Sequence, residues 1–247
     1  MVQLDSFQNF ENDSAVQEVM AAYKNKDIIL FGNACETVYR DIFEYNLEYA
    51  NSHEERFRFT HVDRRVKSPD SLLRKLYGLA TDRRDSGGGV DRNVIQECYQ
   101  EIKDKAGARV SCPYYDEIYP AIEEVIRGHL ADKGYGVNLG NSDPELEDKD
   151  WLDSGDEESG YRAYHLYLKV PTRVDIWGTV ELVLCELQLR SELQHVWSVK
   201  SHDLLYKNDN WDYSDSDVLD DMKAVSNALR AADQNLQSIR NRVQSDV

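Results

Sequence analysis

The sequence is poor in cysteine and proline, has no long apolar run, and carries far fewer basic than acidic residues. Its 247 residues include 4 Cys and 5 Pro, and the cysteines stand singly at positions 35, 98, 112 and 185. Because no CxxC pair occurs, neither a zinc ribbon nor a dithiol redox site is expected, and dispersed thiols are typical of a reduced, cytoplasmic protein. No apolar stretch approaches the roughly 18 residues of a membrane span. The first residues also lack the basic and apolar parts of a secretory signal.

Basic residues are few, and they are also unevenly distributed along the sequence. There are 29 Lys and Arg against 46 Asp and Glu, which gives a formal net charge of −17. Such a charge argues against a long nucleic acid or an anionic membrane as partner, because phosphates would be repelled. Residues 56–84, however, hold nine Lys and Arg and three Asp, a local charge of +6, whereas residues 141–158 carry −8 and residues 208–221 carry −6. We interpret the acidic stretches as solvated loops.

Hydrophobic residues make up 41% of the chain, which is enough for a folded core. Periodicity predicts helices over 14–50, from Ser68-Pro69 through Leu79, and over 92–103, 120–133, 191–207 and 216–243. Strands are predicted over 107–112, 161–170 and 179–190. We therefore expect an α/β (α+β) fold, a mixed β-sheet flanked by helices. Its parts would be an N-terminal helical layer (1–55), a core (56–207), and an acidic loop with a C-terminal helix (208–247).

Polar residues gather at the helix that begins after Ser68-Pro69, an N-cap followed by proline in the first turn. Lys67, Ser71 and Lys75 are spaced four residues apart, so they would line one face near the helix N-terminus. Free N–H groups beside two lysines and a hydroxyl form a suitable cradle for a polyphosphate. No GxxxxGK[ST] occurs, so this is not a Walker loop.

A second polar group follows the predicted strands. In 179–190, Glu186, Gln188 and Arg190 alternate with apolar residues, which places a carboxylate, an amide and a guanidinium on one face. Asp104 immediately precedes the strand over 107–112. If these strands are neighbours, Asp104 and Glu186 supply the hard oxygen ligands that Mg²⁺ prefers beside substrate phosphates.

Planar side chains complete the pattern. Arg65 and Arg109 could stack on one nucleobase, and Tyr161 could stack on a second. In 161–170 Tyr161 and His165 would share a face of the strand. Taken singly, each of these residues also fits an ordinary surface or core position.

Together, four blocks of the sequence resemble the synthetase domain of the RelA/SpoT family, the alarmone synthetases, over about residues 60–207. RVKSPDS at 65–71 with KL at 75–76 is similar to the family pattern RxKxxxSxxxKL. DKAGAR at 104–109 is similar to DxxGxR, and GYRAYH at 160–165 to GYxSxH. ELQLR at 186–190, followed by HDLLYK at 202–207, resembles ExQxR and HxxxYK. Each block is short, but the four occur in the family's order.

The resemblance implies a nucleotidyltransferase-like fold and transfer of pyrophosphate from ATP to the 3′-hydroxyl of GDP or GTP, giving AMP and (p)ppGpp. Asp104 and Glu186 would be catalytic and would bind Mg²⁺, with Glu186 also accepting the proton of the attacking hydroxyl. The residues implied to bind ATP are Arg65, Lys67, Ser71, Lys75 and Arg109. Those implied to bind the acceptor are Tyr161, His165, Gln188 and Arg190.

The sequence departs from the family pattern on the acceptor side. Residues 152–159, before the GY pair, contain no basic residue, although the family often has a Lys there. Toxic small alarmone synthetases vary at such places. The alternatives are therefore a toxic synthetase that acts on adenine nucleotides or on the 3′ end of tRNA, and a non-catalytic nucleotide-binding module. A toxic enzyme would imply an antitoxin.

The C-terminal helix predicted over 216–243 has an apolar stripe that includes Val218, Met222, Val225, Leu229 and Leu236. We expect this stripe to dock on its own domain, with a homo-oligomer interface as the alternative that the family resemblance suggests. His202-Asp203 is a single HD dipeptide without the other ligands of a metal-dependent hydrolase, so no hydrolase activity is expected.

Overall fold

The computed structural model describes residues 2, 4, 6–51, 58–139, 143–175, 177–206 and 216–245. The chain divides into two compact units, each assembled from three segments. The first unit is Met1–Val38, Arg64–Gly107 and Lys169–Glu186; the second is Tyr39–Asp63, Ala108–Leu168 and Leu187–Val247. The domain boundaries predicted at residues 55 and 207 both lie outside the described residues, so that division stays a prediction.

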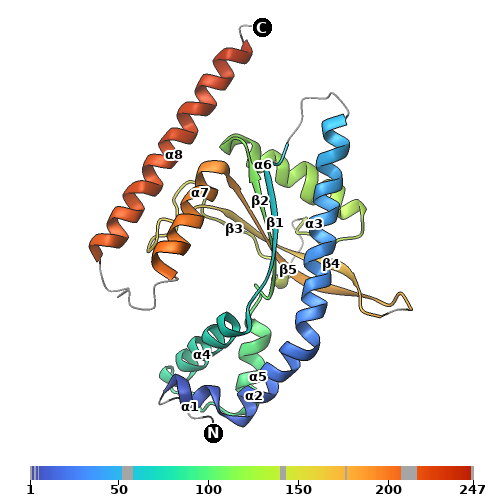
Figure 1. Ribbon diagram of the computed structural model, residues 1–247, viewed down its shortest axis with the longest axis vertical. Helices are drawn as coiled ribbons and strands as arrows, with labels where there is room; N and C mark the ends of the chain where they lie inside the picture. The colour runs from blue at the N-terminus through green and yellow to red at the C-terminus, as the bar shows by residue number, and fades with distance from the viewer. Residues whose placement is uncertain are drawn as a thin grey trace. The chain divides into compact units, whose positions relative to one another are not determined.

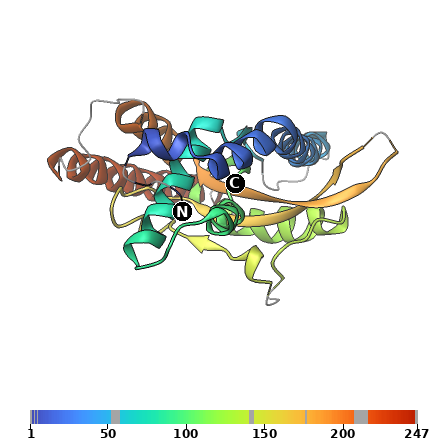
Figure 2. The ribbon, with the colours of Figure 1, turned by 90° about the horizontal axis from the view of Figure 1, so that it is seen from below.

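The helices of the first unit begin at polar residues whose side chains accept backbone N–H groups, as N-caps do. They are α1 (Phe7–Glu11), α2 (Ser14–Ala22), α4 (Pro69–Asp85) and α5 (Arg92–Glu101), capped by Ser6, Asp13, Ser68 and Asp91. A π-helix, η1 (Tyr23–Asp27), joins α2 to the long α3 (Ile28–Asn51). The apolar faces of α1, α2, α4 and α5 share one core (Figures 1 and 2).

Five strands form one mixed sheet in the order β1-β2-β5-β4-β3. Their bounds are β1 (His61–Val66), β2 (Ala106–Cys112), β3 (Lys149–Asp150), β4 (Tyr164–Arg173) and β5 (Val180–Ser191). β3 is antiparallel to β4, with Lys149 opposite His165. β4 and β5 form a hairpin, drawn in orange in Figure 2, whose turn is held by Asp175 accepting the N–H of Thr179 at 2.9 Å. A mixed sheet flanked by helices was predicted, and it is confirmed.

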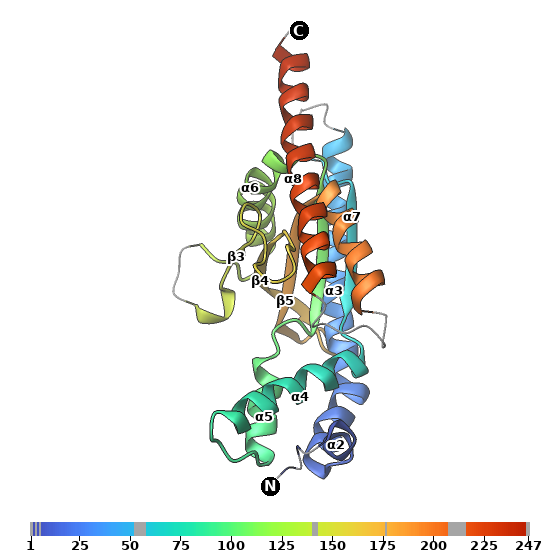
Figure 3. The same ribbon diagram turned by 90° about the vertical axis from the view of Figure 1, so that its left-hand side faces the viewer.

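The later helices of the second unit follow β2 and β5 along the chain. They are α6 (Ile118–Ala121), continued by the π-helix η3 (Ile122–Leu130); α7 (Glu192–Ser201), continued by η5 (His202–Tyr206); and α8 (Ser216–Ser245). Short 3₁₀ turns occur at η2 (Tyr115–Glu117) and η4 (Pro144–Leu146). α8 lies along α7 (Figure 3). The indole N–H of Trp197 donates to the Met222 carbonyl at 3.0 Å.

One predicted strand is displaced. β4 begins at Tyr164 rather than at residue 161. The carbonyl of Tyr161 accepts the N–H of Asp156 at 2.7 Å, a bond within the preceding loop and not to a neighbouring strand. Tyr161 therefore belongs to a loop and does not share a strand face with His165 as predicted.

Two further expectations concerned the cysteines and the lack of a long apolar segment. All four cysteines are free and buried. Among the described residues, no helix has both the length and the apolar character needed to cross a membrane.

Candidate active site

One candidate cluster lies in the first unit, at the junction between β1 and α4. The Ser68 hydroxyl accepts the N–H of Ser71 at 3.2 Å and donates to the Ser71 hydroxyl at 2.9 Å, and Pro69 occupies the first turn. The helix start predicted from Ser68-Pro69 is thus confirmed. Lys67 precedes the helix instead of lying on its face, so the predicted row of three residues along the helix is wrong for that residue.

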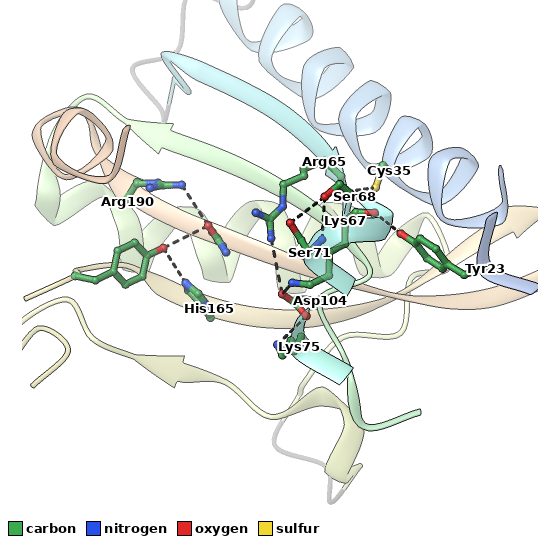
Figure 4. A network of polar contacts seen from close by, with 12 residues as sticks. Tyr23, Cys35, Arg65, Lys67, Ser68, Ser71, Lys75, Asp104, His165 and Arg190 are labelled. Carbon is green, nitrogen blue, oxygen red and sulfur yellow. Dashed lines mark hydrogen bonds and ion pairs between the residues drawn. The ribbon is translucent and has the colours of Figure 1, made fainter. Parts of the chain in front are cut away.

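Two lysines nevertheless converge, on the carboxylate of Asp104 in the turn between α5 and β2 (Figure 4). Lys67 Nζ lies 2.6 Å from Asp104 Oδ2, and Lys75 Nζ lies 2.8 Å from Oδ1. Arg65 Nη2 is 3.8 Å from Oδ2. The structure therefore brings together Arg65, Lys67 and Lys75 from the predicted ATP-binding set with the predicted metal ligand Asp104.

Electrostatics keeps this carboxylate ionised. Burial by itself would raise the pKa of Asp104, but the hydrogen bonds from Lys67 and Lys75 lower it to about 2. Burial lowers the pKa of Lys67, which is only 8% exposed, while the bond to Asp104 opposes that shift. The cluster thus holds a buried anion against cationic groups that a phosphate could also bind.

The backbone of this cluster is fixed by residues that sequence reasoning missed. The Tyr23 hydroxyl, on η1, donates to the carbonyl of Lys67. The Cys35 thiol, on α3, lies 3.3 Å from the carbonyl of Arg65. Neither contact has a sequence signal, because both side chains would be interpreted as core residues of amphipathic helices.

Lys105, next to Asp104, is a second missed residue. Its ammonium donates to the carbonyls of Tyr99 at 2.8 Å and Ile102 at 2.5 Å, at the C-terminal end of α5. Its own carbonyl accepts the N–H of Lys67 at 3.0 Å. Lys105 therefore ties the turn that carries Asp104 to the segment that carries Lys67.

Glu186, the second predicted metal ligand, lies on β5 and is 7% exposed. A Cβ added at Gly107 would lie 3.5 Å from the Glu186 carbonyl, so β2 and β5 run close together there. Among the described residues, no group of three or more His, Cys, Asp or Glu could hold a metal ion. Two carboxylates with water and phosphate oxygens would still suit Mg²⁺. Joint metal binding by Asp104 and Glu186 stays a prediction.

A separate cluster lies in the second unit and contains all four residues that were predicted to bind the acceptor. The Tyr161 hydroxyl is 2.9 Å from His165 Nε2 and donates to Gln188 Oε1 at 3.3 Å. Arg190 Nη2 donates to the same oxygen at 3.2 Å (Figure 4). The guanidinium of Arg190 lies 6.0 Å from the centre of the Tyr161 ring. The convergence of these four residues is confirmed, whereas their binding of an acceptor stays a prediction.

Two tryptophans surround this cluster. Trp151 packs edge-on against His165, with ring centres 4.9 Å apart and an interplanar angle of 87°. The ring centres of Trp197 and Tyr161 are 6.2 Å apart. Trp151 was missed, although a single aromatic residue within an acidic run is a signal that the run packs on something.

The expectation of a solvated loop over the acidic stretch is confirmed only in part: Glu145, Glu147, Glu157 and Glu158 are exposed, but other acids of the stretch have partners. Asp148 pairs with Arg127 at 2.6 Å, and Asp153 pairs with Arg230 at 2.6 Å. Asp150 accepts the hydroxyl of Tyr119 at 2.6 Å. These contacts neutralise part of the −8 charge, which sequence reasoning could not foresee because the partners lie on η3, α6 and α8.

Arg109 also lies in the second unit. Burial lowers the pKa of His195 to about 4, and the charges of Arg190, His61 and Arg109 act in the same direction. The charge of Asp63 acts in the opposite direction, so these shifts show that Arg109 and Arg190 both lie near His195. The predicted pairing of Arg109 with Arg65 around one base stays a prediction.

Known proteins of similar sequence indicate the family to which the two clusters belong. Residues 64–211 match the family described as "Region found in RelA / SpoT proteins". GTP pyrophosphokinase YwaC of Bacillus subtilis (strain 168) is 25% identical over 200 residues, 81% of this chain and 80% of that protein. GTP pyrophosphokinase YjbM of the same strain is 28% identical over 148 residues, 59% and 61% of the two chains.

Solved structures agree on the fold. Small alarmone synthetase 1 from Bacillus subtilis, bound to its product pppGpp, matches with a TM-score of 0.65 and 22% identity over 88% of this chain and 96% of that chain. Small alarmone synthetase 2 from the same species matches with a TM-score of 0.65 and 20% identity over 90% and 99%. With more than half of its length in the matched region, the chain belongs to the RelA/SpoT family.

Proposed function

We propose that the protein is a pyrophosphokinase that transfers the pyrophosphoryl group of ATP to the 3′-hydroxyl of GDP or GTP, producing AMP and (p)ppGpp. The observation that carries the proposal is the convergence of Lys67 and Lys75 on Asp104 beside the N-terminus of α4. Cationic side chains and free helix N–H groups are what a nucleoside triphosphate requires. The two curated relatives are named GTP pyrophosphokinases, which supports the same reaction.

On the donor side, a bound triphosphate would take over Lys67 and Lys75 from Asp104. The carboxylate of Asp104, with its pKa of about 2, is ionised throughout the working pH range and fits an oxygen ligand of Mg²⁺. Glu186 would be the second ligand. Mg²⁺, when bound, would neutralise charge on the phosphates. The guanidinium groups of Arg65 and Arg109 would hold the adenine, and the Ser71 hydroxyl would bind a phosphate oxygen.

On the acceptor side, Tyr161 would stack on the guanine, and His165, Gln188 and Arg190 would orient the nucleotide. Glu186 would accept the proton of the 3′-hydroxyl as its oxygen bonds to the β-phosphorus of ATP. The bond from that phosphorus to the oxygen bridging the α- and β-phosphates breaks, and AMP leaves. Because positioning and charge neutralisation dominate such transfers, the protein has mainly to hold two nucleotides in line.

Product analysis tests the proposal. The full chain with Mg²⁺ and ATP labelled in its terminal phosphate is offered GDP, GTP, ADP, ATP or deacylated tRNA. The expected result is AMP together with labelled 3′-pyrophosphorylated guanosine nucleotides. Label in adenine nucleotides or in tRNA alone would instead favour the alternative acceptors, and no AMP with any acceptor would leave a non-catalytic binding module.

We place the enzyme in the cytoplasm, where ATP and guanine nucleotides are available, and the four free thiols agree with a reducing compartment. A toxin role would require growth arrest on expression that a second protein relieves. Expression alone and with candidate antitoxins measures that role separately from the chemistry.

The proposed partners include a second copy of the chain, bound through α8. Its apolar residues alternate in steps of four and three, which is the spacing of a coiled-coil seam: 218, 222, 225, 229, 232, 236, 239 and 243. Val225, Leu236, Ile239 and Val243 on this seam are exposed. An antiparallel partner helix would bring Asp221 of one copy opposite Arg242 of the other.

The molar mass in solution tests this association. Ile239→Glu is expected to reduce it to that of a monomer, because a charge in the seam is costly to bury. Gln234→Glu, a charge of the same sign on an exposed position off the seam, is the matched control. A monomeric wild-type protein at micromolar concentration would contradict the proposal.

A further inference from the structure

Helix α8 docks on the second unit with buried polar residues as well as with part of its apolar stripe, whose Met222 and Leu229 are half-buried. Ser226 is 4% exposed and Asp233 is 3% exposed, whereas Val225 and Leu236 of the predicted docking stripe are 50% and 47% exposed. The prediction that the stripe holds α8 on its own domain is therefore wrong for these two positions. Buried polar side chains are costly unless they have partners. The hydrogen-bond partners of Ser226 and Asp233 therefore indicate which segments the helix holds in place.

Ser226 anchors the loop in front of Tyr161. Its hydroxyl donates to the carbonyl of Gly160 at 2.5 Å. Gly160 has a φ of 75°, and a Cβ added there would lie 3.1 Å from the Cα of Lys223. The backbone of α8 therefore passes directly over Gly160, and only glycine allows both this approach and this conformation. Tyr161, the next residue, is the centre of the predicted acceptor cluster.

Asp233 anchors the end of β5. Its Oδ2 accepts the hydroxyl of the fully buried Ser191 at 2.5 Å. The same Ser191 oxygen accepts the N–H of Gln194 at 3.2 Å and caps α7. Ser191 follows Arg190 directly. Asp233 thus fixes the backbone from which the Arg190 guanidinium reaches Gln188.

These two anchors are independent of each other and hold the two segments that the predicted acceptor cluster joins. They lie seven residues apart on α8, and so share one face of the helix. Residues 216–245 also lie beyond the matched family region, which ends at 211. The role of α8 is therefore an inference from this chain's own contacts.

We propose that α8 positions the acceptor-binding residues, with Ser226 and Asp233 as positioning residues for Tyr161 and Arg190. This inference rests on the proposed function, because it assigns the cluster to the acceptor nucleotide. Neither residue touches the nucleotide. Each fixes the backbone beside a side chain that does, so its loss weakens acceptor binding and leaves the ATP-binding cluster of the first unit intact.

Steady-state kinetics of Ser226→Ala and Asp233→Ala tests the inference, with Ser238→Ala, an exposed serine of the same helix, as the matched control. Loss of one buried hydrogen bond is expected to raise KM for GDP about 3–10-fold. KM for ATP should stay within about twofold of wild type, as should both constants for Ser238→Ala. Asp233→Asn, which keeps an acceptor for the Ser191 hydroxyl, should restore most of the affinity for GDP.

Several outcomes would overturn the inference: an unchanged KM for GDP, a parallel rise of both KM values, or no recovery in Asp233→Asn. Melting temperatures separate positioning from unfolding, and if Asp233→Ala does not fold, Ser226→Ala and Asp233→Asn carry the test. If the wild-type protein makes no product, the proposed function fails by itself. Calorimetric titration of GDP into wild type and variants then decides the role of α8, since equal affinities would refute it.

Discussion

Replacing Asp104 by Asn removes the anion on which Lys67 and Lys75 converge. The pKa of Asp104 falls from 3.8 to about 2 on folding, because the bonds from Lys67 and Lys75 outweigh its burial. At about 1.4 kcal/mol per pKa unit, this pairing contributes about 2–3 kcal/mol to the free energy of unfolding at neutral pH. The side chain of Asp104 is only 14% exposed, so little of this is screened by solvent.

The sign of the pH dependence follows from the direction of the shift. A carboxyl group whose pKa is lowered by folding stabilises the native state fully above its unfolded pKa and loses that effect as the pH falls through the folded value. The difference between wild type and Asp104→Asn should therefore be full near pH 7 and about half as large near pH 3. The neutral amide also leaves Lys67 buried without its carboxylate, which lowers the pKa of that lysine further.

Urea denaturation followed by tryptophan fluorescence near pH 7, 5 and 3 measures the effect. Asp82→Asn makes the same chemical change at an exposed position of α4. It should alter the free energy of unfolding by no more than about 0.5 kcal/mol at any pH. The reasoning is refuted if Asp104→Asn matches that control at neutral pH, or if its deficit does not shrink between pH 5 and 3.

Three further predictions concern single residues. Glu186→Gln keeps the shape of the side chain but removes the proposed base, so kcat should fall about 10²–10⁴-fold with an unchanged circular dichroism spectrum; full activity would contradict the assignment. Gly160→Ala should lower the free energy of unfolding by more than Gly134→Ala in denaturant titrations. Both glycines have positive φ, 75° and 86°, but only at Gly160 would the new Cβ meet Lys223, at 3.1 Å; equal losses would show that α8 is not packed there. Burial lowers the pKa of Lys105 from 10.5 to about 8, so the unfolded chain binds more protons between these values and stability should rise with pH over that range. Lys105→Met should lack this rise in urea midpoints, and a rise of the same size in both proteins would refute the shift.

Local patterns in the sequence were sufficient for much of the fold. Ser68-Pro69 gave the start of α4 because a cap and a first-turn proline act on adjacent residues. Alternation over 179–190 gave β5 and its row of polar side chains, because strand geometry repeats every two residues. The strand over 161–170 was misplaced at its start, because the Tyr161 carbonyl bonds to the N–H of Asp156 within the preceding loop, and periodicity does not record such bonds.

For the candidate site, too, some residues could be predicted from the sequence and their tertiary contacts could not. The four sequence blocks singled out Asp104, Lys67, Tyr161 and Arg190, and the structure places each of them in one of two polar clusters. What holds these residues could not be predicted. Lys67 and Asp104 are 37 residues apart in the chain, and Ser226 and Gly160 are 66 apart, so their contacts depend on how distant elements pack.

The sequence by itself determined the family and most of the helices and strands, since periodicity and short motifs are written in neighbouring positions. Only the tertiary structure decided how the charges are used. It placed basic residues around Asp104, paired part of the acidic stretch with Arg127 and Arg230, and buried Ser226 and Asp233 on the docked side of α8. Each of these results depends on contacts between residues that are far apart in the sequence and on how deeply those residues are buried. Neither can be derived from local sequence patterns.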